Sequence, residues 1–269
     1  MVLPWDKDFL SSEIELSPKT ILYASEGQNV NSVSRTIVKK VLGNIDSKDY
    51  LNLPLEEIAS QNFIFLHPKD KSVIDIDQIR DSFKYLFLKS NSKRLLYLEN
   101  IERVETRTFN TLLKFSEEAD KNIIIYMATN NINIVPKTIL SRFQKLKIPK
   151  PSNENVNEHL TNLGLNFDEQ KNDFVLQNLN LLSEHEDKDI NELFLKFDEY
   201  EAKKQIPTKD KEEIRLFLDY QIHKIKFNML KLNTNKKGKL DEFRDLRKQI
   251  LMPHNLSLDI LKSKLCLYI

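Results

Sequence analysis

Two uninterrupted apolar runs, with a helical pattern between them, constrain the fold of this chain most. The runs cover 95–98 and 123–128, and polar residues follow each of them at 99–100 and 129–131. Apolar runs of this length that do not alternate with polar residues are typical of parallel strands covered on both faces. Between them, the apolar residues of 109–118 recur at helical spacing and leave the charged residues on the other side. We therefore predict an α/β layer with a parallel sheet.

The polar residues at the strand ends form a first candidate site. Ligands in open parallel sheets bind beyond the carboxyl ends of the strands. Glu99 and Asn100 follow the first apolar run, and Thr129 follows the second. An earlier apolar strand at 20–24 leads into a polar loop that contains Gly27. These four residues are therefore expected to lie at the same edge of the sheet.

The order of these elements resembles the nucleotide-binding module of AAA+ proteins. Two motifs, Asn-Thr-Leu-Leu-Lys at 110–114 with Glu-Glu at 117–118, and Thr-Ile-Leu-Ser-Arg at 138–142, are similar to signatures of the clamp-loader branch. The segment Asn-Leu-Ser-Leu-Asp-Ile-Leu at 255–261 resembles the closing helix of the delta-prime family of the bacterial DNA polymerase III clamp loader. The resemblance covers most of residues 20 to 150 and is weaker beyond them.

The loop that should hold phosphates lacks the residues for that task. Such a loop needs several glycines, so that backbone N–H groups can surround the phosphates, and a lysine that reaches the outer ones. The loop at 25–32 has Gly27 alone and no lysine, and Glu26 would repel phosphate. Asn100 stands where active family members carry a second acidic residue, and an amide cannot act as a base. The site of Gly27, Glu99, Asn100 and Thr129 is therefore expected to be degenerate, with no nucleotide cofactor and no ATP hydrolysis.

The resemblance implies another role for Ser141 and Arg142. In the family, each ATP site is completed by an arginine from the neighbouring subunit, which neutralises charge on the transferred phosphoryl group. Arg142, with Ser141 before it, is thus expected to be an arginine finger in trans, while ATP and Mg²⁺ are held by the neighbours. The alternative is a surface arginine that pairs with a nearby acid.

Three domains are expected along the chain. Two prolines within 148–153 interrupt regular structure, and the residues after them follow helical patterns. The resemblance implies an AAA+-like α/β domain at 1–149, a small helical lid at 150–187 and an all-helical collar for oligomerisation at 188–269. The second lid helix is expected to turn its apolar residues inward, and these are Phe174, Val175, Leu179 and Leu182.

Charge and composition exclude several other classes of protein. The 41 basic and 40 acidic residues give a net charge of +1, which disfavours a stand-alone DNA-binding module. Cys266 is the only cysteine, so neither a disulfide framework nor a cysteine zinc site is expected. No apolar run approaches the roughly 20 residues of a membrane span. A cytoplasmic protein without a metal site or a membrane partner is expected.

The leading functional hypothesis is a non-catalytic, delta-prime-like subunit of the DNA polymerase III holoenzyme, the assembly that contains the DNA-directed DNA polymerase. The resemblance implies that it braces the ring that loads a sliding clamp onto primed DNA. Its partners would be gamma/tau-like ATPase subunits, a delta subunit and the clamp. Two alternatives stay open. One is a delta-type subunit that opens the clamp with an exposed apolar wedge, and the other is an active AAA+ ATPase with a divergent loop.

Overall fold

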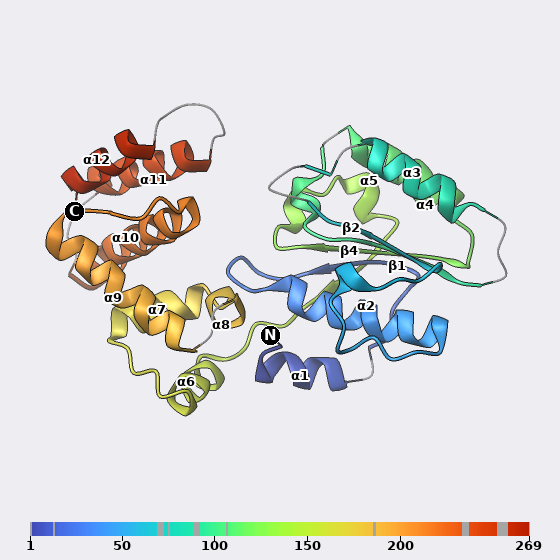
Figure 1. The fold of residues 1–269 in the computed structure, drawn as a ribbon, viewed down its shortest axis with the longest axis horizontal. Helices are drawn as coiled ribbons and strands as arrows, with labels where there is room; N and C mark the ends of the chain where they lie inside the picture. Colours follow the sequence, from blue (N-terminus) through green and yellow to red (C-terminus); the bar gives the residue numbers. More distant parts are fainter. Residues whose placement is uncertain are drawn as a thin grey trace. The chain divides into compact units, whose positions relative to one another are not determined.

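The computed structural model describes residues 2–12, 14–68, 73–74, 76–88, 92–105, 107–184, 187–232, 237–251 and 258–268. Strands and helices alternate in the N-terminal part, as Figure 1 shows. The strands are β1 (Lys19–Tyr23), β2 (Phe63–Leu66), β3 (Arg94–Leu98), β4 (Ile123–Thr129) and β5 (Gln144–Lys147). The helices of this part are α1 (Pro4–Ser11), α2 (Val30–Asp46), α3 (Ile76–Leu86), α4 (Thr108–Glu118) and α5 (Lys137–Leu140).

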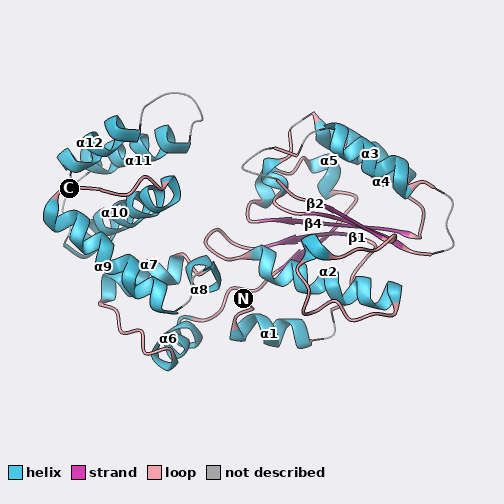
Figure 2. Ribbon diagram, viewed as in Figure 1, coloured by secondary structure: helices cyan, strands magenta, loops and turns pink. Residues whose placement is uncertain are grey.

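Short 3-10 helices and a helical C-terminal part complete the described chain. The 3-10 helices are η1 (Leu55–Glu57), η2 (Ile101–Arg103) and η3 (Ile132–Ile134). The C-terminal helices are α6 (Asn153–Asn162), α7 (Glu169–Gln177), α8 (Asn180–Glu184), α9 (Asp187–Lys203), α10 (Lys211–Leu232), α11 (Lys237–Leu251) and α12 (Leu258–Tyr268). Figure 2 separates these helices from the strands by colour. No helix in the described ranges is long and apolar enough to cross a membrane.

The five strands form one parallel sheet in the order β2-β3-β4-β1-β5. All seven residues of β4 are buried, as are the last four of β3. Helices α3, α4 and α5 cover one face of this sheet, and α1 and α2 cover the other (Figure 1). Central strands covered on both faces have no solvent side, which explains why their sequences do not alternate. The predicted α/β layer with flanking helices is confirmed.

The side chains of β3 show how the two faces are filled. Leu96 and Leu98 join the core beneath α3, α4 and α5. Leu95 and Tyr97 point to the opposite face and join the core beneath α1 and α2. Because successive strand residues point to opposite faces, one short run builds both cores. Glu99, the residue that follows this run, is also buried.

The chain divides into two compact units, Met1–His159 with Asn178–Glu184, and Leu160–Gln177 with His185–Ile269. The core of the second unit contains aromatic rings from α7, α9 and α10. The ring of Phe174 meets that of Tyr220 edge to face, with centroids 5.3 Å apart, and Phe194 lies against both. The residues of the predicted lid at 150–187 are thus divided between the two units. The three-domain scheme itself stays a prediction.

The single helix expected around Phe174 to Leu182 is in fact two helices. Helix α7 ends at Gln177, and α8 begins at Asn180. The backbone N–H of Asn180 donates to the carbonyl oxygen of Gly27 at 2.7 Å, within the first unit. A contact so distant in sequence leaves no trace in the local apolar spacing, so the pattern did not predict this break.

Candidate functional site

The residues predicted for a nucleotide site lie at the carboxyl edge of the sheet. Gly27 is in the loop after β1, Glu99 and Asn100 follow β3, and Thr129 is the last residue of β4. The backbone N–H of Ala24 donates to the carbonyl oxygen of Thr129 at 3.3 Å, so the ends of β1 and β4 are adjacent. This is the edge at which open parallel sheets bind their ligands.

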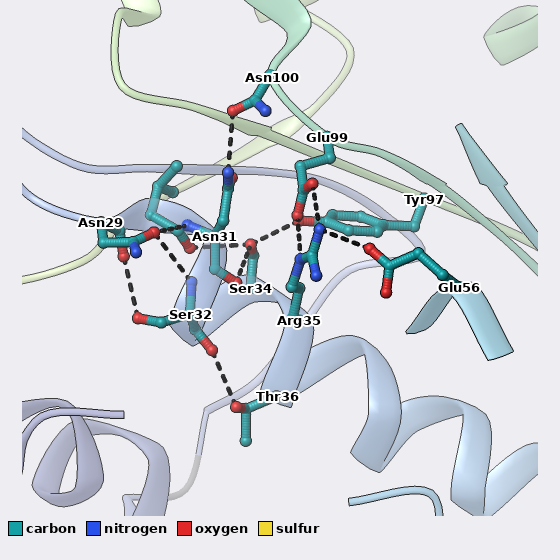
Figure 3. A network of polar contacts seen from close by, with 11 residues as sticks. Asn29, Asn31, Ser32, Ser34, Arg35, Thr36, Glu56, Tyr97, Glu99 and Asn100 are labelled. Carbon is teal, nitrogen blue, oxygen red and sulfur yellow. Dashed lines mark hydrogen bonds and ion pairs between the residues drawn. The ribbon is translucent and has the colours of Figure 1, made fainter. Parts of the chain in front are cut away.

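An arginine of the same chain pairs with Glu99 (Figure 3). Arg35 Nε donates to Glu99 Oε1 at 2.5 Å, and Arg35 Nη2 donates to Glu99 Oε2 at 2.7 Å. Nη2 also pairs with Glu56 Oε1 at 3.0 Å. The two parallel hydrogen bonds form the bidentate geometry that makes arginine–carboxylate pairs strong. The hydrogen bonds that Arg35 donates to Glu99 raise the pKa of Arg35 above its usual value, so the guanidinium stays charged.

The Arg35–Glu99 pair is part of a buried polar network. Glu99 is only 3% exposed, and Tyr97 beside it is fully buried. The Tyr97 hydroxyl lies 2.6 Å from Ser34 Oγ and 3.4 Å from Glu99 Oε1. Burial, followed by the charge of Glu99, raises the pKa of Tyr97 well above its usual value, so the phenol stays protonated and can donate. These side-chain contacts join helix α2 to strand β3 and to Glu99 after it.

The loop before α2 is filled by its own side chains. Gln28 is 5% exposed, and its Oε1 accepts a hydrogen bond from the backbone N–H of Ser25 at 3.0 Å. Its Nε2 donates to the carbonyl oxygen of Pro149 at 3.0 Å. Asn29 caps α2, because its Oδ1 accepts from the backbone N–H groups of the second and third helix residues at 3.0 and 3.3 Å. These helix N–H groups are the donors that a bound phosphate would need.

Asn100 and Thr129 also have partners within the chain. Asn31 Nδ2 donates to Asn100 Oδ1 at 3.0 Å (Figure 3). Thr129 is fully buried, and its hydroxyl donates to Glu102 Oε2 at 2.8 Å. Glu99, Asn100 and Thr129 therefore each have a side-chain partner within the chain, whereas the buried Oδ1 atoms of Asn31 and Asn130 have none among the described residues.

The residues present do not fit a magnesium nucleotide. Glu99 could ligate Mg²⁺ only if it left Arg35, and the guanidinium would then lie beside the incoming cation. Asn29 would have to release the helix N–H groups before a phosphate could use them, and the loop supplies no lysine. Within the described ranges, no group of three or more His, Cys, Asp or Glu side chains is placed to hold a metal ion.

Ser141 and Arg142 lie in the turn between α5 and β5. Arg142 Nη2 pairs with Glu117 Oε1, on α4, at 2.6 Å. Its Nη1 donates to the carbonyl oxygen of Thr138 at 2.9 Å and to Ser141 Oγ at 3.4 Å. The Arg142 side chain is 41% exposed. The guanidinium is therefore held at the surface, where another protein can reach it.

Arg142 lies at the amino edge of the sheet, opposite the candidate nucleotide site. Strand β5 begins at Gln144, two residues after Arg142, and Gln144 pairs in parallel with Thr20 near the start of β1. A strand of five residues spans about 16 Å. Glu99 and Arg142 thus lie at opposite ends of the strands, and Arg142 cannot reach the candidate nucleotide site of its own chain.

The sequence did not identify Arg35, Gln28 or Glu117 as members of these sites. The spacing of Asn31 and Arg35 could have indicated that Arg35 belongs to the site. The two residues are four positions apart and therefore lie on the same side of a helix. They contact the consecutive residues Asn100 and Glu99. No comparable signal existed for Gln28, whose amide bonds across 121 positions to Pro149.

Comparisons with known proteins match this chain to subunits of DNA polymerase III. The model of a family described as "DNA polymerase III, delta subunit" matches residues 16–152. A DNA polymerase III subunit gamma of Buchnera aphidicola subsp. Baizongia pistaciae (strain Bp) is 34% identical over 103 residues, which are 37% of this chain and 27% of that protein. The subunit gamma of Buchnera aphidicola subsp. Schizaphis graminum (strain Sg) is 33% identical over 102 residues, 36% of this chain and 28% of that protein.

This chain thus spans about a quarter of the length of the curated relatives that it matches. Among solved structures, a DNA polymerase III gamma subunit-related protein from Thermotoga maritima MSB8 aligns with 98% of this chain and 96% of its own. Its TM-score is 0.47 and its sequence identity is 15%.

Proposed function

This chain belongs to the DNA polymerase III, delta subunit family, and on that premise we propose that it is a clamp-loader subunit that completes the ATP site of a neighbour without hydrolysing ATP itself. Its neighbours are ATPase subunits of the gamma/tau type, and ATP and Mg²⁺ are held by them. The assembly also contains a delta subunit, and it loads a sliding clamp onto primed DNA. The helical residues from about 188 onward serve as the collar that braces the ring.

One observation carries this proposal. The two candidate sites lie at opposite edges of the sheet, with Glu99 after β3 and Arg142 just before β5. An arginine that cannot reach the nucleotide site of its own subunit can act only on a nucleotide held by another one. The half-exposed guanidinium of Arg142 is available for such a contact.

The chemistry of this contact is electrostatic. Negative charge spreads over the oxygens of the γ-phosphoryl group as it is transferred, and a planar guanidinium can donate two hydrogen bonds to them. Ser141 donates its hydroxyl to the carbonyl oxygen of Thr138 at 3.0 Å and so helps to close the turn that carries Arg142. The internal pairing of Glu99 with Arg35 supports the second half of the proposal, that this subunit holds no nucleotide.

Replacement of Arg142 by alanine tests the proposal. We expect Arg142→Ala to fold and to assemble normally, because the side chain lies at the surface. ATP hydrolysis stimulated by clamp and primed DNA should be slower in the assembled complex. An arginine finger contributes on the order of 10³-fold or more at the site it serves. The loss summed over the ring should be smaller, because the other sites keep their own arginines. The rate is measured on complexes purified with the ATPase subunits encoded by the same genome.

Two further variants make the result specific. Arg142→Lys should not restore the rate, because a lysine has no planar fork. Arg80→Ala is the matched control, since Arg80 is another exposed arginine of the same unit, paired with Asp77 at 3.3 Å. Unchanged hydrolysis and clamp loading in a fully assembled Arg142→Ala complex would show that Arg142 is an ordinary surface residue.

One observation favours the delta-type alternative. Exposed apolar side chains follow the end of α3, with Phe87 44% and Leu88 58% exposed, and Tyr85 is 37% exposed beside them. An apolar projection of this kind is what a clamp-opening subunit needs. Direct binding of the isolated chain to the sliding clamp, abolished by Leu88→Ser, would favour this alternative over a subunit that serves only its ATPase neighbour.

A further inference from the structure

The guanidinium of Arg142 is held from two sides by acceptors of its own chain. Glu117 Oε1 on α4 accepts from Nη2 at 2.6 Å, and the carbonyl oxygen of Thr138 on α5 accepts from Nη1 at 2.9 Å. Acceptors on two different nitrogens fix both the position and the plane of the group. An arginine side chain has many rotamers, and this double anchorage restricts that freedom in Arg142.

The backbone at both ends of the Arg142–Glu117 pair is attached to the core. Ile139 and Phe143, on either side of Arg142, are 0% and 6% exposed. The backbone N–H of Arg142 donates to the carbonyl oxygen of Ile139 at 2.9 Å. Ser116, which precedes Glu117, is 2% exposed. The pair therefore joins two elements that are themselves fixed, and its geometry is built into the fold.

Glu117 leaves part of the guanidinium available for another ligand. A guanidinium carries five N–H donors, and the contacts to Glu117, Thr138 and Ser141 use at most three of them. A phosphate oxygen from a neighbouring subunit can therefore bind the remaining donors while Glu117 stays in place.

Two opposing effects of Glu117 can be compared by magnitude. Its negative charge competes with phosphate, but an exposed ion pair changes an equilibrium constant by less than about fivefold. Both side chains are about half exposed, so this limit applies here. Prior ordering of the arginine side chain favours binding by up to roughly 30-fold, because its rotamer freedom is lost beforehand. The upper limit of the ordering effect is therefore the larger of the two.

We propose that Glu117 is a positioning residue for the arginine finger, which orients Arg142 toward the nucleotide of the neighbouring subunit before the subunits meet. This inference rests on the proposed function of Arg142. Glu117 binds Nη2 of Arg142, so that the phosphate meets a guanidinium already in its binding orientation.

Stimulated ATP hydrolysis in the assembled complex is the first test. We expect Glu117→Ala to lower the rate at the site served by Arg142 about fivefold, within the limit set by side-chain ordering. Glu117→Gln should keep most of the rate, because the amide oxygen still accepts a hydrogen bond. The matched control is Glu118→Ala, which removes the same charge from the next, exposed position of α4 and should leave the rate unchanged. In an Arg142→Ala background, Glu117→Ala should have no further effect.

The second test uses the isolated full-length chain and needs no ATPase partner. Nitrogen relaxation of the Arg142 Nε–H group reports the mobility of its side chain, and the signal is assigned by its loss in Arg142→Lys. We expect greater mobility in Glu117→Ala than in the wild type or in Glu118→Ala. Equal mobility in all three proteins would overturn the positioning role.

The outcomes separate this inference from the proposed function. If Arg142→Ala slows hydrolysis but Glu117→Ala leaves it unchanged or faster, Arg142 is a finger that Glu117 does not position. If Arg142→Ala itself has no effect in a fully assembled complex, both conclusions fall. A rate lost equally in Glu117→Ala and Glu118→Ala would show an effect of charge alone, and would also overturn the inference.

Discussion

At the residue scale, two buried carboxylates of the first unit have very different surroundings. Glu99 is 3% exposed and receives two hydrogen bonds from Arg35. Asp6 on α1 is 6% exposed, and its carboxylate receives a hydrogen bond from the backbone N–H of Leu3. Burial raises the pKa of Asp6 from 3.8 to about 6, because a single backbone donor does not replace the lost water. Asp6 is therefore a local source of instability at neutral pH.

Asp6→Asn should flatten the pH dependence of stability between about pH 4 and pH 6.5. The folded pKa lies above the unfolded value of 3.8, so the native state holds the proton more tightly. The stability that this tighter proton binding adds to the folded state is fully present below pH 3.8. It is lost as the pH rises through about 6. The ionised carboxylate then destabilises the wild type by up to about 3 kcal/mol, and asparagine cannot ionise. Urea unfolding at several pH values measures this.

The control for this change is Asp8→Asn, which removes the same charge from an exposed position of α1. Asp8→Asn should lose stability between about pH 4 and pH 6.5, as the wild type does. If Asp6→Asn and the wild type lose stability in parallel as the pH rises, the carboxyl of Asp6 is already ionised in the folded protein at low pH, and the expectation is wrong.

At the element scale, the end of α2 depends on a close approach of two backbone segments. Ser47 adopts a left-handed conformation with φ of 54°, and the N–H of Lys48 donates to the carbonyl oxygen of Gly43 at 3.1 Å. A Cβ on Gly43 would lie 2.6 Å from the carbonyl oxygen of Lys48. This closure directs the chain back toward Tyr50, which is buried against α2.

Gly43→Ala should destabilise the protein by about 1–3 kcal/mol, because backbone atoms must move to admit the methyl group. Gly238→Ala is the matched control. Gly238 lies in the first turn of α11 with no atom within 4 Å of its added Cβ, so alanine should be neutral or stabilising by up to about 1 kcal/mol there. Thermal unfolding of both variants shows whether Gly43→Ala lowers the stability and whether Gly238→Ala leaves it equal or higher. A Gly43→Ala protein as stable as the wild type would contradict the close approach.

Elements that depend on local pattern could be predicted from the sequence. The apolar runs at 95–98 and 123–128 are buried strands, and the predicted inner side of α4, with Phe109 and Leu112, is buried. The break between α7 and α8 could not be predicted, because the contact from Asn180 to Gly27 acts across 153 positions of the chain. The candidate site likewise contains some residues that local sequence motifs predict and others that they do not. Glu99 and Arg142 were named from motifs, whereas Gln28 acts through a fold-dependent contact.

At the scale of the whole molecule, side-chain contacts connect separate elements at the carboxyl edge of the sheet. Arg35 connects α2 to the end of β3 and to Glu56 on η1, and Asn31 adds a contact to Asn100. These contacts hold α2, η1 and the end of β3 together within the chain.

Mg-ATP should not stabilise the full-length chain against heat. A ligand that binds the folded state at 100 times its dissociation constant adds about 2.7 kcal/mol of stability. At about 2 mM Mg-ATP this would reveal any site with a dissociation constant near 20 µM or tighter. We expect no change in the unfolding temperature by scanning calorimetry. A rise of more than about 2 °C, on the order of half a kcal/mol or more for a chain of this size, would favour the alternative of an active ATPase.

The Arg35–Glu99 pair also bears on how such a chain can evolve. Loss of Arg35 alone would leave Glu99 buried and unpaired, which destabilises a protein by about 3–5 kcal/mol. Gain of a loop lysine alone would bring a second cation beside Arg35. Neither of these single changes is therefore expected to create a stable nucleotide-binding protein. Nucleotide binding at this edge would therefore require changes at several positions together.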